Sequence, residues 1–375
     1  MFGSCFFLLK FVSIMKNRIL ISLFILASMI HAAAQEQPLR LAIAGVTHDH
    51  IHEVAIRLNS GDFELVGVYE QNDNYRNSNA LTGKVDASLF YADLEDMLDT
   101  VKPEAVAAYG AISEHIAIVE ACAPRGIDVM VEKPLTTTVK DAMRIEALSK
   151  KYGIKVLTNY ETTWYSSNWH TRDIIEKGDI GPVLRMNVYD GHEGPVEIGC
   201  NAKFLEWLTD PVKNGGGAVV DFGCYGANLA TWLLHGQEPE TVFAVLHQHK
   251  PDIYPNVDDD ATIIVQYPDA TVQIMASWSW PMNRKDMYVY GMKGYVYQKN
   301  SKEMQTYLNE NLSPTFVAPE LPTVYENPFR FLRAVVRDEI KMEPYDPSSL
   351  ENNIMVVRIL EAARKSAARQ RVIKF

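Results

Sequence analysis

Apolar and polar positions follow two different patterns along this chain. From residue 39 to about 158, short apolar runs alternate with stretches in which apolar residues recur every three or four positions. This alternation predicts strands separated by amphipathic helices, and therefore βαβ units and a parallel sheet. The predicted strands are Leu39–Ala44, Glu64–Tyr69, Ala105–Ala108, Val129–Val131 and Lys155–Thr158, and the predicted helices are 49–59, 94–98, 113–123 and 138–151.

After residue 160 the apolar runs become rich in β-branched and aromatic residues, with turn signals such as Pro268-Asp269 between them. This second pattern predicts an α+β domain with a large, mostly antiparallel sheet. Its predicted strands are Val183–Tyr189, Thr241–His249, Ala261–Tyr267, Thr271–Trp280, Met287–Tyr290 and Tyr295–Tyr297, and helices over 328–340 and 347–368 close the chain. We therefore predict a parallel α/β domain over 37–160 and an α+β domain over 161–375.

The first 34 residues have the pattern of a secretory signal peptide. Lys16 and Arg18 precede an apolar run from Ile19 to Ile30, and three alanines end the segment. We expect cleavage near Ala34–Gln35 and a periplasmic or secreted mature chain. The apolar run is too short to span a bilayer comfortably, so we expect no membrane anchor after cleavage.

Charge and cysteine content narrow the function classes. The net charge is −11, and it becomes −14 without residues 1–34, which contain Lys10, Lys16 and Arg18 and no acidic residue. A strongly acidic surface repels phosphate backbones, which argues against nucleic-acid binding. After cleavage the remaining cysteines are Cys122, Cys200 and Cys224, an odd and sparse set that does not form a disulfide framework.

One predicted strand delivers a lysine to the edge of the sheet. The apolar run ending at Val131 is followed by Glu132, Lys133 and Pro134, and the proline stops the strand. Ligands of open α/β sheets bind outside the carboxyl ends of the strands, where an ammonium group is poised for chemistry. These residues alone equally suit a surface lysine after a buried strand.

The turn after the first strand resembles an incomplete dinucleotide-binding motif. Of the pattern Gly-x-Gly-x-x-Gly only Gly45 remains, because Thr47 and His50 replace the other two glycines, with His48 between them. We expect this turn to lie against the diphosphate of a dinucleotide, since backbone N–H groups before a helix suit a phosphate. Glu70 ends the second strand at the spacing of the ribose-binding acid, which favours NAD over NADP.

A metal site is a rival interpretation of the same turn. His48, His50 and His52 alternate directly after a strand, and His192, His247 or His249 could complete a ligand set. The barrel that such metal hydrolases use needs many more βα repeats than this chain offers. We therefore predict no metal centre and give these histidines structural or cofactor-binding roles.

A second unusual segment runs from Gly215 to Tyr225. Three glycines open an apolar helix that would place Asp221 and Tyr225 four residues apart, on one face. A capped core helix with an N-terminal carboxylate is the alternative interpretation.

Together these segments resemble the Gfo/Idh/MocA oxidoreductases over residues 37–375. Glu132-Lys133-Pro134 matches the Glu-Lys-Pro motif of that family, and His115 matches a recurrent histidine. Trp164 to Pro182 matches the segment that enters the second domain, while Glu326 to Phe329 and Ser349 to Asn353 resemble the closing helices. Tyr225 stands where the family usually has a histidine four residues after the aspartate.

The resemblance implies an N-terminal Rossmann domain and hydride transfer between a nicotinamide and a hydroxyl-bearing carbon of a sugar, glycoside or cyclitol. Tyr225 would accept the hydroxyl proton, Lys133 would hold the oxygen, and Asp221 would orient the pair. The cofactor would contact residues from four segments of the chain: Gly45, Thr47, His48, His50, Glu70, His115, Glu132 and Lys133. The family also implies a homo-oligomer.

A tyrosine is a weak base at neutral pH unless its pKa falls. Lowering a pKa of about 10 by about 3 units needs roughly 4 kcal/mol. One ammonium about 4 Å away, at an effective dielectric constant of about 20, supplies roughly that much. We therefore expect Lys133 to lower the pKa of Tyr225, and Lys133→Met to abolish turnover while leaving the fold intact.

Export raises a difficulty, because free NAD is not expected outside the cytoplasm and the start of the chain shows no twin-arginine signal. An enzyme could keep its nucleotide tightly bound. It could instead use NAD transiently, oxidising a glycoside so that the glycosidic bond is lost by elimination. A third interpretation is a periplasmic carbohydrate-binding or non-redox protein that has lost the cofactor.

Overall fold

The computed structural model describes residues 37–375, so the predicted signal peptide at 1–34 lies outside the described residues. The first described strands form a parallel sheet in the order β3-β2-β1-β4-β5-β6. This order confirms the predicted parallel α/β arrangement. Its strands are β1 (Leu39–Ala44), β2 (Phe63–Tyr69), β3 (Phe90–Tyr91), β4 (Ala105–Ala108), β5 (Asp128–Glu132) and β6 (Val156–Asn159).

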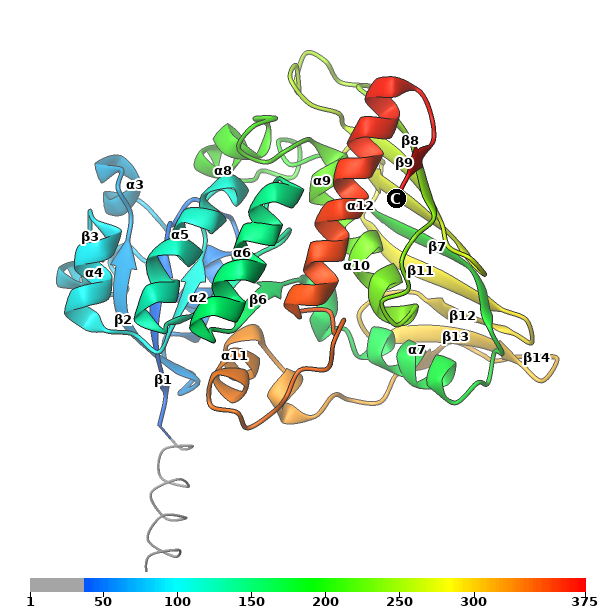
Figure 1. The fold of residues 1–375 in the computed structure, drawn as a ribbon, viewed down its shortest axis with the longest axis horizontal. Helices are drawn as coiled ribbons and strands as arrows, with labels where there is room; N and C mark the ends of the chain where they lie inside the picture. The colour runs from blue at the N-terminus through cyan, green and yellow to red at the C-terminus, as the bar shows by residue number, and fades with distance from the viewer. Residues whose placement is uncertain (1–36) are drawn as a thin grey trace, which may run out of the picture. The chain divides into compact units, whose positions relative to one another are not determined.

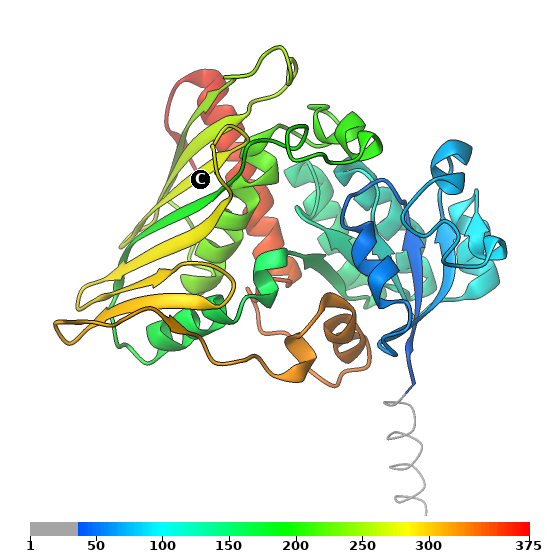
Figure 2. The same ribbon diagram turned by 180° about the vertical axis from the view of Figure 1, so that it is seen from behind.

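Helices cover both faces of this sheet, since its strands are apolar on both sides. Helices α5 and α6 lie on one face, and α2 lies on the opposite face (Figures 1 and 2). Residues such as Ala42, Val106 and Val129 are fully buried between the layers. The helices are α2 (Ile51–Arg57), α3 (Asp73–Asn77), α4 (Leu94–Val101), α5 (His115–Cys122) and α6 (Val139–Tyr152).

The second sheet is large and mostly antiparallel, as predicted. Its main path is β14-β13-β12-β11-β7-β10-β9-β8-β16, with β15 paired to β13, and its only parallel neighbours among the described strands are β7 and β10. The strands are β7 (Val183–Gly191), β8 (Thr241–His247), β9 (Asp260–Gln266), β10 (Thr271–Ser277), β11 (Arg284–Gly291), β12 (Tyr295–Gln298), β13 (Glu303–Leu308), β14 (Asn311–Leu312), β15 (Phe316–Val317) and β16 (Ile373–Lys374).

Helices α10 and α12 pack on the face of the large sheet that turns toward the first sheet (Figure 1). Of these, α12 also contacts α6 and β6, and so joins the two sheets. The helix starts at Ser349, whose hydroxyl accepts from the Asn352 N–H and caps it. The helices of this part are α7 (Ser166–Glu176), α8 (Ala202–Leu208), α9 (Ala218–Asp221), α10 (Gly223–Leu233), α11 (Pro328–Val336) and α12 (Leu350–Arg369).

The single helix predicted after Gly215 is wrong, because the chain forms two segments, α9 and α10, that meet at Phe222. The Asp221 carbonyl accepts hydrogen bonds from Lys133 Nζ (3.0 Å) and Cys224 Sγ (3.2 Å). The Tyr225 N–H donates to the Phe222 carbonyl. Lys133, the residue after β5, thus bonds the carbonyl that a continuous helix would use.

None of the helices in residues 37–375 is both long and apolar enough to cross a membrane.

Candidate active site

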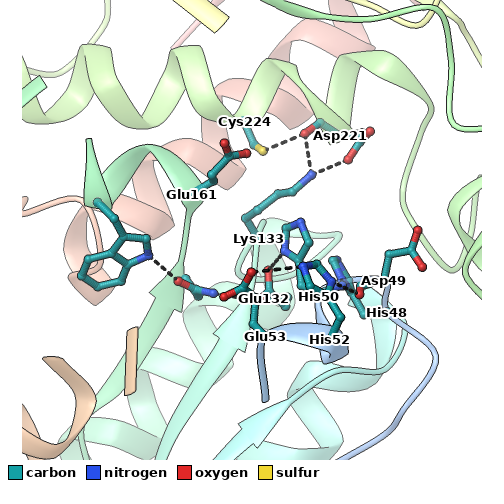
Figure 3. A network of polar contacts seen from close by, with 12 residues as sticks. His48, Asp49, His50, His52, Glu53, Glu132, Lys133, Glu161, Asp221 and Cys224 are labelled. Carbon is teal, nitrogen blue, oxygen red and sulfur yellow. Dashed lines mark hydrogen bonds and ion pairs between the residues drawn. The ribbon is translucent and has the colours of Figure 1, made fainter. Parts of the chain in front are cut away.

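Lys133 and Asp221 form a buried ion pair where the first sheet meets helix α9. Their side chains are 6% and 8% exposed, and the Lys133 ammonium donates to Asp221 Oδ1 (Figure 3). The other carboxylate oxygen accepts from Trp278 Nε1 at 2.9 Å. Burial acts to lower the pKa of Lys133, but the Asp221 charge outweighs it, so the pKa is raised. Lys133 therefore stays a cation at any physiological pH.

Tyr225 lies between two lysines but is not made acidic by them. Lys133 Nζ is 5.0 Å and Lys285 Nζ is 4.4 Å from the centre of its ring. Burial and the nearby Glu161 and Asp190 carboxylates raise the pKa of the phenol well above its usual value. The expected lowering by Lys133 is therefore wrong, because each lysine is neutralised by a carboxylate of its own.

Lys285 and Glu161 form a second ion pair in the site. Lys285 Nζ lies 2.6 Å from Glu161 Oε2 and 3.8 Å from the fully buried Asp190 carboxylate. Burial raises the pKa of Asp190 to about 8. Burial also acts to raise the pKa of Glu161, but Lys285 overrides it and lowers the pKa to about 2. No sequence motif predicted that Lys285, Glu161 and Asp190 would lie at this site, because they come from segments that are far apart in the chain.

The predicted catalytic residues Lys133, Asp221 and Tyr225 line one cavity of about 850 Å³. The same cavity is bordered by the first turn, with His48 and His50 in its wall, and by Lys285 and Glu161. A second cavity of about 730 Å³ shares the side chains of His50, His52, Glu161 and Tyr165 with the first. The structure thus brings together two carboxylates, two lysines and a phenol around a space that suits a small polar ligand.

His50 makes an unexpected contact with the Glu-Lys-Pro segment. Its Nδ1 lies 3.0 Å from Glu132 Oε2, and Glu132 Oε1 accepts from Asn159 Nδ2 at 2.7 Å (Figure 3). Glu132 is only 2% exposed. Burial acts to raise its pKa, but His50 lowers it, so the carboxylate stays ionised and can only accept. His50 Nδ1 must therefore carry the shared hydrogen.

The histidines considered as alternative metal ligands do not all come together. Ligand atoms of His48, His50 and Glu132 lie within 4.8 Å of one another, whereas His247 and His249 stack on each other on and just after β8. His48 Nδ1 accepts from the His50 N–H at 3.0 Å, so a neutral His48 carries its hydrogen on Nε2. Both nitrogens of His48 are thus committed, and we assign no metal centre to this cluster.

A third cavity, of about 570 Å³, lies on the other side of the first turn. Gly45, Thr47 and Glu70 line it, together with the ring of Trp207 from helix α8. The Glu70 carboxylate accepts from the N–H groups of Val46 (3.3 Å) and Asn72 (2.9 Å) and is 8% exposed. Glu70 therefore has the place and the free lone pairs of a ribose-binding acid.

His115 does not join the cofactor residues. It is fully buried, and its Nδ1 lies 3.1 Å from the Leu135 carbonyl. Burial lowers its pKa to about 4, so it is neutral. It lines none of the three cavities, and it supports the segment after Lys133 instead of contacting a ligand.

Sequence comparison places both parts of the chain in one family. Residues 39–160 match a family described as "Oxidoreductase family, NAD-binding Rossmann fold", and residues 169–297 match the "GFO/IDH/MocA C-terminal domain". The chain belongs to the Gfo/Idh/MocA family.

Curated relatives of this Gfo/Idh/MocA chain are distant. It is 26% identical over 155 residues to trans-1,2-dihydrobenzene-1,2-diol dehydrogenase of Bos taurus, covering 41% of this chain and 42% of that one. It is 22% identical to myo-inositol 2-dehydrogenase of Thermotoga maritima, covering 76% of this chain and 83% of that one. The chain spans about half the length of the dihydrodiol dehydrogenases that it matches.

Two solved structures have a fold similar to that of this chain. The aldose-aldose oxidoreductase of Caulobacter crescentus, complexed with glycerol, has a TM-score of 0.76 at 22% identity, covering 90% of this chain and 100% of that one. An inositol dehydrogenase homolog of Azotobacter vinelandii, complexed with NAD+, has a TM-score of 0.76 at 17% identity, covering 90% and 98%. At these identities the likeness shows the fold.

The residues present fit the two ends of the dinucleotide that this Gfo/Idh/MocA fold implies. Glu70 suits the ribose, and the Lys133 cavity suits the nicotinamide. The N–H groups of the turn between them already have protein partners. Thr47 and His48 both donate to the Tyr109 carbonyl (3.0 and 2.9 Å), and His50 donates to His48. Trp207 Nε1 also donates to Thr47 Oγ1 at 3.1 Å.

Close packing of neighbouring residues holds this turn in place. Gly45 has a φ of +79°, and a Cβ there would lie 2.6 Å from the backbone of Gly110, so the glycine is needed for packing between two turns. The rings of Phe204 and Trp207 then cover His48.

Proposed function

We propose that this protein is a nicotinamide-dependent oxidoreductase that acts on a hydroxyl group of a sugar, glycoside or cyclitol. One observation carries the proposal. The buried Lys133 ammonium and the Tyr225 phenol face one cavity at the carboxyl end of β5, next to the turn and the Glu70 carboxylate of a Rossmann domain. Two fixed donors in one cavity suit a single alcohol oxygen.

The side chains have separate tasks in this proposal. Lys133 and Tyr225 remain protonated and donate to the substrate oxygen, and Asp221 fixes the position of the lysine. A nicotinamide, when bound, supplies the acceptor for the hydride of the carbinol carbon. Glu70 would accept from a ribose 2′-hydroxyl and repel a 2′-phosphate, which supports NAD over NADP.

The two connected cavities support a carbohydrate larger than one ring. The first cavity holds the charged groups, and the second is bordered by Trp164, Tyr165 and Tyr325. Aromatic rings beside charged groups suit the apolar face and hydroxyls of a sugar. A glycoside could thus place its reacting ring near Lys133 and its second ring or aglycone near Trp164.

The location of the protein stays a proposal drawn from its first 34 residues. A periplasmic or secreted enzyme would have to keep its nucleotide bound, and a covered turn of the kind formed by His48 and Trp207 would slow nucleotide release. We also propose a homo-oligomer, on the family resemblance alone.

The first experiment is to denature the purified protein and assay the supernatant for NAD(H) and NADP(H). Full occupancy by NAD(H), together with nicotinamide reduction on a panel of sugars, glycosides and cyclitols, supports the proposal. Released aglycone from a glycoside would favour the oxidation–elimination variant.

The engaged N–H groups of the turn favour one second candidate, a protein that acts without a cofactor. Absence of nucleotide from the purified protein, and no binding of added NAD or NADP, would decide for this candidate and against the oxidoreductase.

A further inference from the structure

We propose that His50, held by Glu132, accepts the proton of the substrate hydroxyl, the task first given to Tyr225. The inference rests on the proposed oxidoreductase function and assigns its proton acceptor. It follows from the hydrogen bonds of Lys133, Tyr225, Glu161 and the four histidines that line the cavity.

Lys133, Tyr225 and Glu161 are unsuitable as bases. Lys133 is a permanently protonated partner of Asp221. Tyr225 keeps its proton because burial and nearby carboxylates oppose its ionisation. Glu161 is ionised and bound to Lys285 and to the Tyr165 hydroxyl; burial acts to raise its pKa, but Lys285 lowers it to about 2, so this carboxylate is a weak base toward an alcohol.

The histidines of the cavity differ in which ring nitrogen is free. His48 and His192 each accept a backbone N–H at Nδ1, from His50 (3.0 Å) and from Gly194 (2.9 Å). In their neutral forms both must therefore carry hydrogen on Nε2, where they can only donate. His52 lies at the rim with Nδ1 on the Asp49 carbonyl (2.7 Å) and Nε2 on Glu53 (3.1 Å).

His50 has the opposite arrangement. Its Nδ1 hydrogen is committed to Glu132, so the neutral ring presents the lone pair of Nε2. Among the histidines of residues 37–375 that border this cavity, His50 alone combines a donated Nδ1 hydrogen with an Nε2 that has no protein partner. Its side chain is 31% exposed, which leaves the ring open to the cavity.

Glu132 is built to hold this ring. The Asn159 amide fixes its other oxygen at 2.7 Å, and Trp164 Nε1 donates to Asn159 Oδ1 at 3.1 Å. Figure 3 shows the contact between His50 and Glu132 below the Lys133–Asp221 pair. Burial acts to lower the pKa of His50, but Glu132 more than offsets it, so the pKa is raised and the imidazolium is stabilised after proton transfer.

The step balances with the groups named. The O–H bond of the alcohol breaks, and its proton goes to His50 Nε2, which becomes an imidazolium paired with Glu132. The C–H bond of the same carbon breaks, and its hydride leaves with both electrons to an oxidised nicotinamide dinucleotide. The carbon–oxygen bond becomes a carbonyl, whose oxygen Lys133 and Tyr225 hold by hydrogen bonds. Return of the proton to water regenerates the neutral ring.

The test compares His50→Asn with His249→Asn, a control whose exposed side chain lines none of the three cavities. We measure turnover with the substrate that the panel of sugars, glycosides and cyclitols identifies. We also measure the amount of bound nicotinamide dinucleotide, and the dinucleotide affinity by fluorescence titration. We expect His50→Asn to lower kcat by about 10²- to 10⁴-fold, the usual worth of a general base, with dinucleotide affinity changed less than about threefold. His249→Asn should match the wild type.

Glu132→Gln separates a base from a structural role. Loss of the carboxylate charge lowers the pKa of His50, so the acid limb of kcat/KM should move to lower pH. A lower rate with an unmoved limb would overturn the proposal. Nitrogen-15 NMR of the imidazoles gives a readout without turnover, and a neutral His50 with its hydrogen on Nε2 would also overturn it.

The remaining outcomes are equally decisive. If the wild type and the His50→Asn variant are both active, His50 is not the proton acceptor, but the proposed oxidoreductase function is retained. If the wild type binds no nicotinamide dinucleotide and oxidises no polyol, both the proposed oxidoreductase function and the proton transfer to His50 are refuted. Stoichiometric zinc that is lost from His50→Asn would show that the nitrogen is a metal ligand and overturn the proposal.

Discussion

Replacing Lys133 by methionine should both stop turnover and weaken the fold. The sequence motif alone suggests an intact fold, but the structure places the partner carboxylate of Asp221 in the interior at 8% exposure. Removal of one member of a buried ion pair leaves an uncompensated charge and costs about 3–5 kcal/mol. Trp278 would still donate to Asp221, which favours the lower part of that range.

The assay is thermal unfolding followed by tryptophan fluorescence. At about 2 °C per kcal/mol for a domain of this size or larger, Lys133→Met should lower Tm by roughly 6–10 °C. The double variant Lys133→Met/Asp221→Asn should recover most of that loss, since the buried charge is gone, but should stay inactive.

Lys365→Met is the matched control, because Lys365 pairs with Glu361 on the surface of α12 at 51% exposure. An exposed pair of this kind contributes less than about 1 kcal/mol. A Lys133→Met protein as stable as the control would refute the reasoning that the pair is buried and coupled.

Further predictions address single groups. Tyr225→Phe should lower kcat about tenfold, the worth of one hydrogen bond, without moving the acid limb of the pH profile; a shifted limb would make the phenol the base. Lys133 lowers the pKa of Asp221, so the pair stabilises the protein above the unfolded pKa of about 3.9, and this stability is lost as the pH falls. Chemical unfolding of Asp221→Asn should therefore vary less between pH 5 and about pH 3 than that of the wild type. Glu70→Ala should weaken NAD binding about tenfold in a fluorescence titration, and an unchanged affinity would contradict the ribose assignment.

Much of the fold follows from local pattern. β1 and β4 have the predicted bounds, because a short apolar run between helices has few alternatives to a buried parallel strand. Other elements shift at their ends: α2 is shorter than the predicted 49–59, since His48, Asp49 and His50 form a turn instead of a helical start. Short edge strands such as β14 and β16 lack a hydrophobic repeat, and only pairing with a neighbour defines them.

The sequence by itself determined the family and the parallel and antiparallel sheets, because these depend on motifs and periodicity that are local in the chain. That Lys133, Asp221 and Tyr225 share a site was implied by the family resemblance, and the structure places all three around one cavity. Tertiary structure decided what the groups can do. The pKa of Tyr225, the free nitrogen of His50 and the contribution of Glu161 and Lys285 depend on burial and on partners far away in sequence. Burial and charge pairing act through space at a few ångströms, and no spacing along the chain records them.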